Sequence, residues 1–528
     1  MLSFRGRRMP DLRDHDCLSF SDALFLYLER EGMPLNVASV SVFEGTIPLK
    51  ACIRFVESKL PIIPRYRQRV VVPPLNIGLP TWEADSAFDV RNHIRQLTLR
   101  HGTEAELKTV ASQVLSANMD RSRPLWDLTL LRGLPGNRTA IVTRVHHCLA
   151  DGLSGVGLMS ALMDPSPSPP PAPVQKHRLR SSRPRDAAMS LLSDLINACF
   201  TAARQVLTAQ SDLLHLAQRL VAASGKPPAA EAGLGSDSAT AAPLLEQMGR
   251  LLPELASPAE RLPFNVICHG PQKFNWTQIP LADIKALKHA CGATVNDVLL
   301  TLVTSAVRRY LELHGEPVRG RRLRIVVPVS VRGKESVRDL GNRITFLPVS
   351  VPLDSRRPRK LVAAVQERMA FLKGAHVAEL VGLTGTLLGT IPTSLQALVG
   401  PIASQLPLSV CNLICTNVPG PKDALYLLGH KMLSCYPYVP IGGEMGMNCA
   451  LLTYNGTAYF GFTADARALP DLEQLPKFLD MSFADMQKAL GLKGTRLRRA
   501  RKSRRPTTVV SLEPQPKPPQ TPPVGAAA

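Results

Sequence analysis

The sequence predicts an α/β protein with two domains, and three observations support this fold class. Apolar residues at helical spacing alternate with short runs of β-branched residues, which is the pattern of helices packed on a sheet. The chain has 528 residues, more than one ordinary domain holds. A proline-rich stretch at residues 164–171 separates two regions that each show this alternation.

Shifts in composition divide the chain into four predicted segments. Residues 1–163 form an N-terminal domain and residues 263–492 form a C-terminal domain. Residues 164–262 form a linker, in which 186–223 carries apolar side chains at helical spacing. That amphipathic helix would either pack between the domains or lie on a membrane. Residues 493–528 are basic and proline-rich, so they are expected to be disordered.

Two adjacent histidines follow a predicted strand near the end of the first domain. Residues 139–143 are mostly β-branched, and residues 144–152 read Arg-Val-His-His-Cys-Leu-Ala-Asp-Gly. Because neighbouring strand residues point to opposite faces, His146 and His147 cannot both face one site from a regular strand. We therefore expect one histidine to be held in the scaffold and the other to face a cavity.

A pair of adjacent histidines can also bind a metal ion or serve a purely structural role. A metal site usually needs three or four nitrogen, sulfur or oxygen ligands at compatible spacing. The sequence has no second cluster of histidine and cysteine near the pair, so no metal site is predicted. On spacing alone, a buried and hydrogen-bonded structural pair is favoured over a metal site.

The second domain contains one long helix signal and several strand signals. Thr294 is a good N-cap with Asp297 three residues on, an imperfect capping box, and the apolar helical face runs over residues 298–311. Strands are predicted over residues 324–331, 344–351, 409–417, 448–453 and 458–463. An Asn-Gly dipeptide joins the last two as a hairpin. Pro328 implies an edge, a bulge or a strand end.

The histidine motif resembles that of the coenzyme A-dependent acyltransferase superfamily, His-His-x-x-x-Asp-Gly. Further blocks resemble the bacterial wax ester synthase/diacylglycerol acyltransferase family and occur in family order. These blocks are residues 18–29, 120–126 with Pro124-Leu125-Trp126, 293–300 with Asn296-Asp297, 416–421 and 454–456. One departure is Asn-Asp-Val-Leu-Leu, where the family more often has a second valine.

The resemblance implies two chloramphenicol-acetyltransferase-like domains joined by a crossover, with a substrate channel between them. It implies an O-acyltransferase that moves a fatty acyl group from acyl-CoA, the co-substrate, to diacylglycerol or a long-chain alcohol, with no bound cofactor. The general base would be His147. The supporting residues would be His146, Asp151, Gly152, Asn296 and Asp297. Pro124, Leu125 and Trp126 would pack near the channel wall.

The chemistry of thioesters explains why such a site needs a histidine. A hydroxyl is a poor nucleophile at neutral pH, and an imidazole with a pKa near 6.5 suits the task of removing its proton. A thiolate leaves readily, and the sequence has no Gly-x-Ser-x-Gly nucleophile elbow, so direct transfer without an acyl-enzyme is expected. The oxyanion donor would be Asn296, the helix end beside it, or backbone amides near Gly152. Asp151 would orient the imidazole or, as the resemblance favours, pair with an arginine such as Arg332.

The net charge of +21 bears on the partners. A basic chain can bind nucleic acid, but the tail has no interleaved aromatic residues and no recognition motif is present. A basic surface also suits an anionic membrane, where each Lys or Arg contributes about 1 kcal/mol. We therefore expect no nucleic acid, and a cytoplasmic protein at the inner face of the cell membrane or on lipid inclusions. A solvated tail without a partner is the remaining alternative.

Two alternative functions share parts of this pattern. The condensation domains of peptide synthetases carry the same histidine motif, and a non-catalytic lipid-binding protein could keep the same fold. The Pro-Leu-Trp and Asn-Asp blocks and the lack of a carrier domain argue against the first, and intact His147, Asp151 and Asn296 argue against the second.

The ten cysteines are expected to be reduced and mostly buried. Cys148, inside the motif, is interpreted as a packing residue.

Overall fold

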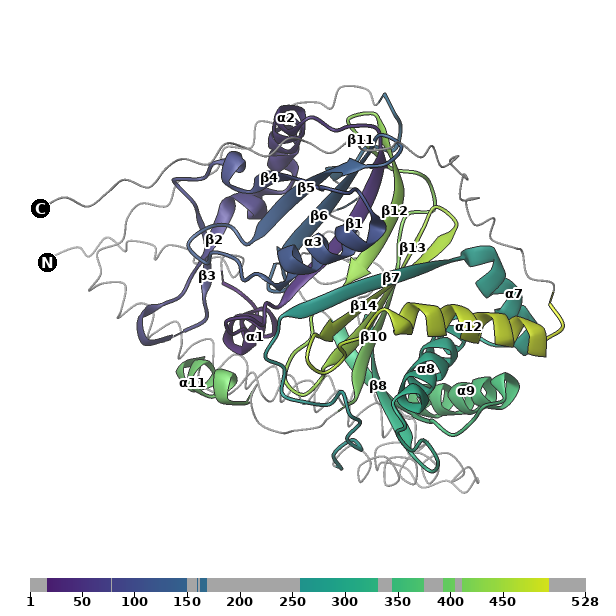
Figure 1. The fold of residues 1–528 in the computed structure, drawn as a ribbon. Helices are drawn as coiled ribbons and strands as arrows, with labels where there is room; N and C mark the ends of the chain where they lie inside the picture. Colours follow the sequence, from purple (N-terminus) through teal and green to yellow (C-terminus); the bar gives the residue numbers. More distant parts are fainter. Residues whose placement is uncertain are drawn as a thin grey trace, which may run out of the picture. The chain divides into compact units, whose positions relative to one another are not determined.

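Two six-stranded sheets organise the chain, as the computed structural model shows (Figure 1). The structure describes residues 17–76, 78–149, 159, 162–168, 257–330, 344–374, 393–403 and 411–492. All of these residues belong to one compact unit that ends at Lys493.

The first sheet is antiparallel except for one strand pair. In spatial order its strands are β11 (Tyr426–Leu427), β12 (His430–Tyr438), β1 (Asn36–Glu44), β6 (Arg138–His146), β5 (Trp126–Leu134) and β4 (Ile94–Thr98). Only β4 and β5 run parallel. A separate ribbon joins β2 (Gln68–Val71) to β3 (Thr81–Ala84). Strand β6 is buried on both faces along most of its length, so its C-terminal end lies within the protein.

The second sheet is mixed. In spatial order its strands are β7 (Gln272–Pro280), β14 (Thr457–Asp465), β13 (Met447–Tyr454), β10 (Leu413–Pro419), β8 (Arg322–Ser330) and β9 (Ile344–Pro352). Strand β10 runs parallel to both of its neighbours, β13 and β8. The other pairs are antiparallel.

Helices cover both sheets. The helices beside the first sheet are α1 (Phe20–Leu28), α2 (Leu49–Lys59) and α3 (Glu104–Ser116), with 3-10 turns η1 (Leu60–Ile62), η2 (Pro64–Arg67), η3 (Pro74–Asn76) and η4 (Val90–Asn92). Those beside the second sheet are α7 (Leu281–Cys291), α8 (Val295–Leu313), α9 (Pro358–Gly374) and α12 (Gln474–Ala489). Helix α11 (Thr393–Ala403) contacts α1 and η3. Helix α3 packs on the first sheet and also contacts β7, which joins the two layers.

The local sequence signals in the second domain are confirmed. The predicted helix is α8, and its capping box is complete, because the Thr294 and Asp297 side chains accept each other's main-chain N–H groups. The hairpin of β13 and β14 turns at Asn455 and Gly456, with φ of 45° and 74°. Two positive φ values are what a tight two-residue hairpin requires. The third predicted strand begins later than expected, at Leu413.

Of the three expectations for Pro328, the bulge is wrong, because Pro328 pairs in register with Phe346 of β9. Strand β8 is not an outer strand of the sheet, since it lies between β10 and β9, but at Pro328 it is paired on one side only. Strand β10 pairs with β8 only at Ile325 and Val326. Pro328 therefore lies beyond the part of β8 that is bonded on both sides, where its missing N–H costs no hydrogen bond in the ladder.

Backbone pairing joins segments that were predicted to belong to different parts of the chain. Strand β12 belongs to the C-terminal half of the sequence, yet it pairs antiparallel with β1, with Ala38 opposite Tyr438 (Figure 1). At the start of the linker, Asp164 pairs with Tyr426 and its carboxylate lies 2.8 Å from Lys59 Nζ. The first sheet is therefore built from both halves of the chain.

Several predicted segments lie outside the described residues. They include the amphipathic segment 186–223, most of the remaining linker and the tail 493–528. Within the described ranges, no single helix is both long and apolar enough to cross a membrane. Helices α7 and α8 pass that test of length and composition only as a pair, bent by 99°.

Candidate active site

The two predicted histidines differ in their surroundings. Strand β6 ends at His146, whose side chain is completely buried. His147 is the first residue beyond the strand and is half-buried. Its main-chain N–H donates to the Leu35 carbonyl at 2.9 Å, which fixes the backbone at the point where the chain leaves the sheet.

His146 is held on both sides of its ring. Its Nδ1 accepts a hydrogen bond from the Cys148 N–H at 3.2 Å, so the ring proton belongs on Nε2. That Nε2 lies 3.4 Å from Glu29 Oε1. A buried carboxylate therefore faces the protonated nitrogen of the first histidine.

Glu29 is the centre of a buried polar network. Its Oε1 accepts the Leu35 N–H at 3.0 Å, and its Oε2 accepts from Arg121 Nη2 at 2.8 Å. Burial raises the pKa of Glu29, but His146, Arg121 and the Leu35 amide outweigh it and lower that pKa to about 2. Because the folded-state pKa lies below the ordinary value of 4.5, this carboxylate stabilises the fold above pH 4.5. That stabilisation is lost as the pH falls towards 2.

The ring of His147 lies flat on an aromatic side chain. The Phe25 and His147 ring centroids are 3.8 Å apart and their planes differ by 9°. Phe25 is on α1, whose first turn is capped by Ser19 Oγ, the acceptor for the Asp22 N–H at 3.1 Å. The stack covers one face of the imidazole, and the Nδ1 atom of the same ring is buried as well.

A second predicted group lies at the N-terminus of α8. Asn296 Oδ1 accepts a hydrogen bond of 2.5 Å from Asn417 Nδ2 on β10, so the N–H₂ end of the Asn296 amide points away from this partner. Asp297 is buried and its carboxylate belongs to the capping box. Asp297 therefore caps the N-terminus of α8, the helix end that carries Asn296. The main-chain N–H groups of this end add partial positive charge beside Asn296.

The structure brings these residues together only in part. Cys148 and Leu149, which follow the histidines, belong to a buried cluster that Val418, next to Asn417, also contacts. The end of the histidine strand and the Asn296–Asn417 pair therefore border the same hydrophobic cluster. Asp151, Gly152 and Arg332 lie outside the described residues, and their roles stay predictions. Pro124, Leu125 and Trp126 are all buried, and the Trp126 indole donates to the Tyr66 carbonyl at 2.8 Å.

Sequence reasoning missed four residues of this arrangement: Phe25, Glu29, Arg121 and Asn417. All four lie inside blocks on which the family resemblance rests, at residues 18–29, 120–126 and 416–421. Their position in these blocks was the feature of the sequence that could have pointed to them. Their side chains meet across long sequence separations, 92 residues for Glu29 and Arg121, which no local pattern encodes.

Two family models together match most of the chain. The model of the wax ester synthase/diacylglycerol acyltransferase catalytic domain matches residues 18–299, more than half of the sequence. The chain belongs to this family. The model of the family's C-terminal domain matches residues 340–487. The resemblance of the five blocks is thereby confirmed, and the protein is an acyltransferase.

Curated relatives of this acyltransferase cover nearly the whole chain. One, from Mycobacterium tuberculosis, carries the name "Probable diacyglycerol O-acyltransferase tgs1"; it is 27% identical over 471 residues, which are 88% of this chain and 95% of that protein. Another from the same species, named with tgs2, is 28% identical over 90% of this chain and all of its own length.

Solved structures confirm the predicted fold. The wax ester synthase/diacylglycerol acyltransferase from Marinobacter aquaeolei VT8 superposes with a TM-score of 0.61 at 23% identity, covering 90% of this chain and 100% of its own. A variant of the starter condensation domain of rhizomide synthetase RzmA, in complex with C8-CoA, gives 0.51 at 13% identity over 90% and 95% of the two chains. At these identities the likeness concerns the fold alone.

The thiol inside the histidine motif of this acyltransferase is poorly suited to nucleophilic attack. Cys148 is 2% exposed. Burial, together with the charges of Asp22 and Glu29, raises the pKa of this thiol well above its usual range. Since the thiolate is the reactive form, the Cys148 side chain lacks the ionised state that a nucleophile needs.

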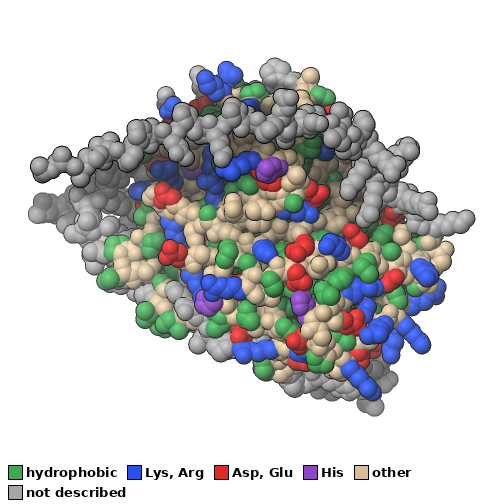
Figure 2. Space-filling view, in the orientation of Figure 1, with side chains coloured by type: hydrophobic (Ala, Val, Ile, Leu, Met, Phe, Trp, Pro, Cys, Tyr) green, Lys and Arg blue, Asp and Glu red, His purple; other side chains and the backbone are tan. Residues whose placement is uncertain are grey.

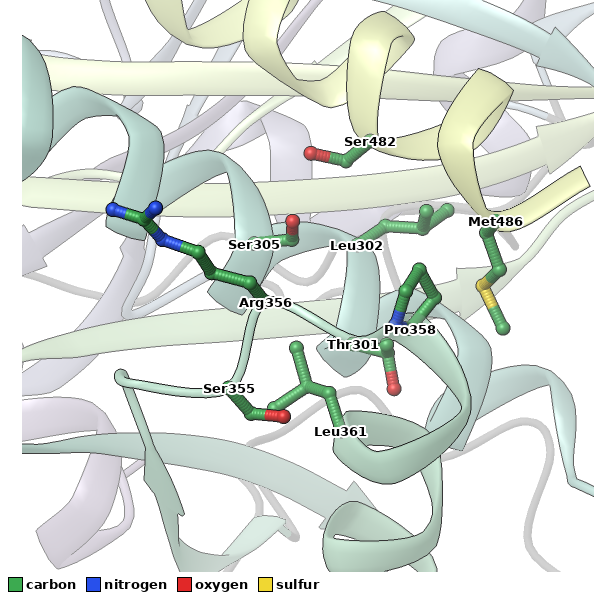
Figure 3. A pocket seen from close by; sticks show the side chains of 9 residues that line it. All are labelled: Thr301, Leu302, Ser305, Ser355, Arg356, Pro358, Leu361, Ser482 and Met486. Atoms are coloured by element: carbon green, nitrogen blue, oxygen red, sulfur yellow. The ribbon is translucent and has the colours of Figure 1, made fainter. Parts of the chain in front are cut away.

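One hollow lies among the helices of the second sheet (Figure 3). Its lining residues are Thr301, Leu302, Ser305, Ser355, Arg356, Pro358, Leu361, Ser482 and Met486. The hydroxyls of Thr301 and Ser482 donate to main-chain carbonyls of their own helices, each at 2.7 Å. Arg356 lies 3.0 Å from Glu312. These polar groups have structural partners, and the hollow lies in the α8, α9 and α12 layer rather than at the histidines.

Proposed function

We propose that this protein transfers a fatty acyl group from acyl-CoA to the hydroxyl of diacylglycerol, of a long-chain alcohol, or of both. The observation that carries the proposal is the placement of His147 in a chain of this family. It follows a buried strand, its backbone is bonded to Leu35, and its ring is stacked on Phe25. Its neighbour His146 is completely buried and held by Glu29 and the Cys148 amide, so the base is assigned to the half-buried His147.

The transfer proceeds in one displacement. His147 takes the proton of the acceptor hydroxyl as the oxygen attacks the thioester carbonyl. The Asn296 amide N–H₂, aided by the α8 N-terminus, donates to the oxyanion of the tetrahedral intermediate. The C–S bond then breaks, the coenzyme A thiolate leaves, and the His147 imidazolium gives its proton to the thiolate or to water. The ester forms without a covalent bond to the protein.

An acceptor assay tests this function directly. Purified protein is supplied with palmitoyl-CoA and, in separate reactions, diolein, hexadecanol or a long-chain amine. Release of free CoA together with triacylglycerol or wax ester supports the proposal. Amide formation alone would favour a condensation-type enzyme, whose fold this chain shares. The absence of any CoA release would favour a lipid-binding protein without catalysis.

Acyl-CoA alone is expected to leave the protein unmodified. The thiol of Cys148, which directly follows the histidines in the sequence, is buried and protonated, so it is not an activated nucleophile that could hold the acyl group. Intact-mass spectrometry after incubation with palmitoyl-CoA checks this result. A stable adduct of palmitoyl mass, mapped to Cys148, would replace direct transfer by a two-step route.

We also propose that the protein works at an anionic lipid surface, since its substrates are insoluble in water. Helix α11 presents an apolar stripe to solvent, at positions i, i+3, i+4 and i+7 of a helix. The stripe consists of Leu395, Leu398, Val399 and Ile402, which are 44–67% exposed. In Figure 2, hydrophobic side chains gather on the part of the surface where Figure 1 places α11. The opposite face of α11, at Gln396 and Ala397, is turned inward.

Removing the stripe and removing the basic tail are expected to weaken binding in different ways. Leu398→Ser with Ile402→Ser should lower flotation on anionic vesicles about tenfold or more at every salt concentration, because burying each side chain is worth about 1.5–3 kcal/mol. Deleting residues 493–528 should remove only a salt-sensitive part, since charges are screened within about 10 Å at 0.1 M. Liposome flotation at two salt concentrations separates these contributions.

The matched control for the stripe is Leu313→Ser. Leu313, at the end of α8, is 54% exposed, as is Ile402, but it is not part of α11. This control should float like the wild type. If the α11 variant floats like the control, the stripe does not bind lipid; if the truncated protein floats unchanged, the tail is a solvated appendage. All variants should keep their turnover with a short, soluble alcohol.

A further inference from the structure

We propose that the C-terminal end of α1 positions the imidazole of His147 for catalysis, with Phe25 holding its ring and Glu29 holding the His146 ring and the Leu35 backbone beside it. The inference rests on the proposed role of His147 as the general base. Neither Phe25 nor Glu29 needs to touch a substrate. Both would act through the histidine pair, so they are positioning residues.

The helix fixes the spacing between the two holding groups. Phe25 and Glu29 are four residues apart, which places them on the same face of a helix, one turn from each other. The Glu29 N–H donates to the Phe25 carbonyl at 3.2 Å and ends the helix. A shift of α1 would therefore move both side chains together relative to His146 and His147.

Glu29 acts on both histidines through one carboxylate oxygen. Its Oε1 lies 3.4 Å from His146 Nε2 and accepts the Leu35 N–H at 3.0 Å. The Leu35 carbonyl in turn accepts the His147 N–H at 2.9 Å. The carboxylate thus fixes the ring of the first histidine and, through one residue, the backbone of the second.

Arg121 prevents the carboxylate from rotating away. Its Nη2 lies 2.8 Å from Glu29 Oε2 and also donates to the Leu26 carbonyl at 2.9 Å. The Glu29 side chain is only 3% exposed, so water cannot readily replace these partners. The N-terminal block and the block before β5 therefore meet at this carboxylate.

Phe25 determines the plane of the His147 ring. With nearly parallel rings 3.8 Å apart, Phe25 covers one face of the imidazole. Because Nδ1 of His147 is buried, Nε2 is the nitrogen that we assign to the acceptor hydroxyl. An aromatic face also favours a cation above it, so the stack stabilises the imidazolium that forms during transfer. The charged groups that act on Cys148, the residue next to the pair, are Asp22 on α1, Glu29 at its C-cap and Arg121 before β5.

Replacing Phe25 by leucine tests the ring contact. Phe25→Leu should lower kcat about tenfold with little change in KM, because the ring is no longer held at the attack geometry. The acid limb of the kcat/KM profile should move about half a pH unit lower, since the imidazolium loses the support of the aromatic face. Phe25→Tyr keeps the ring and should restore both values. Phe20→Leu, the same change at the start of α1, should alter neither.

Replacing Glu29 tests the carboxylate. Glu29→Gln keeps the shape but removes the charge that faces His146 and Arg121, and should lower kcat about tenfold without shifting KM. If Glu29→Gln does not fold, the Phe25→Leu and Phe25→Tyr pair decides alone. Phe25→Leu and Glu29→Gln enzymes with wild-type kcat and an unmoved acid limb would overturn the inference.

The same series separates this inference from the proposed function. If His147→Ala is inactive while the α1 variants behave like the wild type, the base assignment stands and the positioning role falls. If His147→Ala keeps its turnover, His147 is not the base and both fall.

Discussion

Replacing His147 by alanine is expected to lower turnover by at least ~10²-fold, the lower end of what general base catalysis contributes. The protein should remain folded. His147 is half-buried, and its structural hydrogen bond to Leu35 comes from the main chain, so alanine keeps it. Initial rates of CoA release with palmitoyl-CoA and diolein or hexadecanol measure the effect. More than about a tenth of wild-type turnover would contradict the base assignment.

The matched comparison is His146→Ala, which should produce a folded but weakened enzyme. His146 is completely buried against Glu29, so its removal leaves a cavity beside a carboxylate that has lost one of its partners. The defect should therefore appear in stability as well as in rate. Thermal unfolding of both variants distinguishes the two histidines, because His147→Ala should unfold near the wild-type temperature.

The second large effect is expected from Arg144→Ala, which should lower the free energy of unfolding by about 3–5 kcal/mol. Arg144 is 2% exposed, and its Nε and Nη2 lie 2.9 and 2.5 Å from the two carboxylate oxygens of Asp127. Its Nη1 donates to the carbonyls of Val114 and Ala117 at the end of α3. Alanine would leave both that carboxylate and that helix end without their donor.

Arg144→Lys is the control that keeps the positive charge but loses the planar arrangement of hydrogen-bond donors. A lysine keeps the positive charge but cannot reach two carboxylate oxygens and two carbonyls from one planar group. It should recover only part of the lost stability. Urea unfolding followed by circular dichroism gives both values. A loss below about 1 kcal/mol for the alanine variant would show that this network does not stabilise the junction of α3 with the first sheet.

Elements defined by neighbouring residues could be predicted from the sequence. Helix α8 follows from its apolar spacing and its Thr294 cap, and the β13–β14 hairpin follows from Asn455-Gly456. Strand β6 and the two histidines at its end are likewise local. In each case the determining contacts lie within a few residues of each other.

Contacts between distant segments could not be predicted in this way. Nothing in residues 430–438 indicates that they pair with β1 rather than with strands of their own half. Pro328 left an edge, a bulge and a strand end open. The sequence could not decide among them, because the extent of pairing between β8 and β10 is a property of the assembled sheet. Glu29 and Phe25 were overlooked as site residues for the same reason, since their partners come from other blocks of the sequence.

The exchange of β12 into the first sheet sets an order of events during synthesis. Strands β1, β6, β5 and β4 leave the ribosome long before residues 430–438. Until β12 arrives, β1 has a bare edge of unpaired N–H and C=O groups, which is a template for association with other chains. Such a late, long-range pairing is slow to form. A nascent chain of this protein therefore depends on protection of the β1 edge until residues 430–438 have been made.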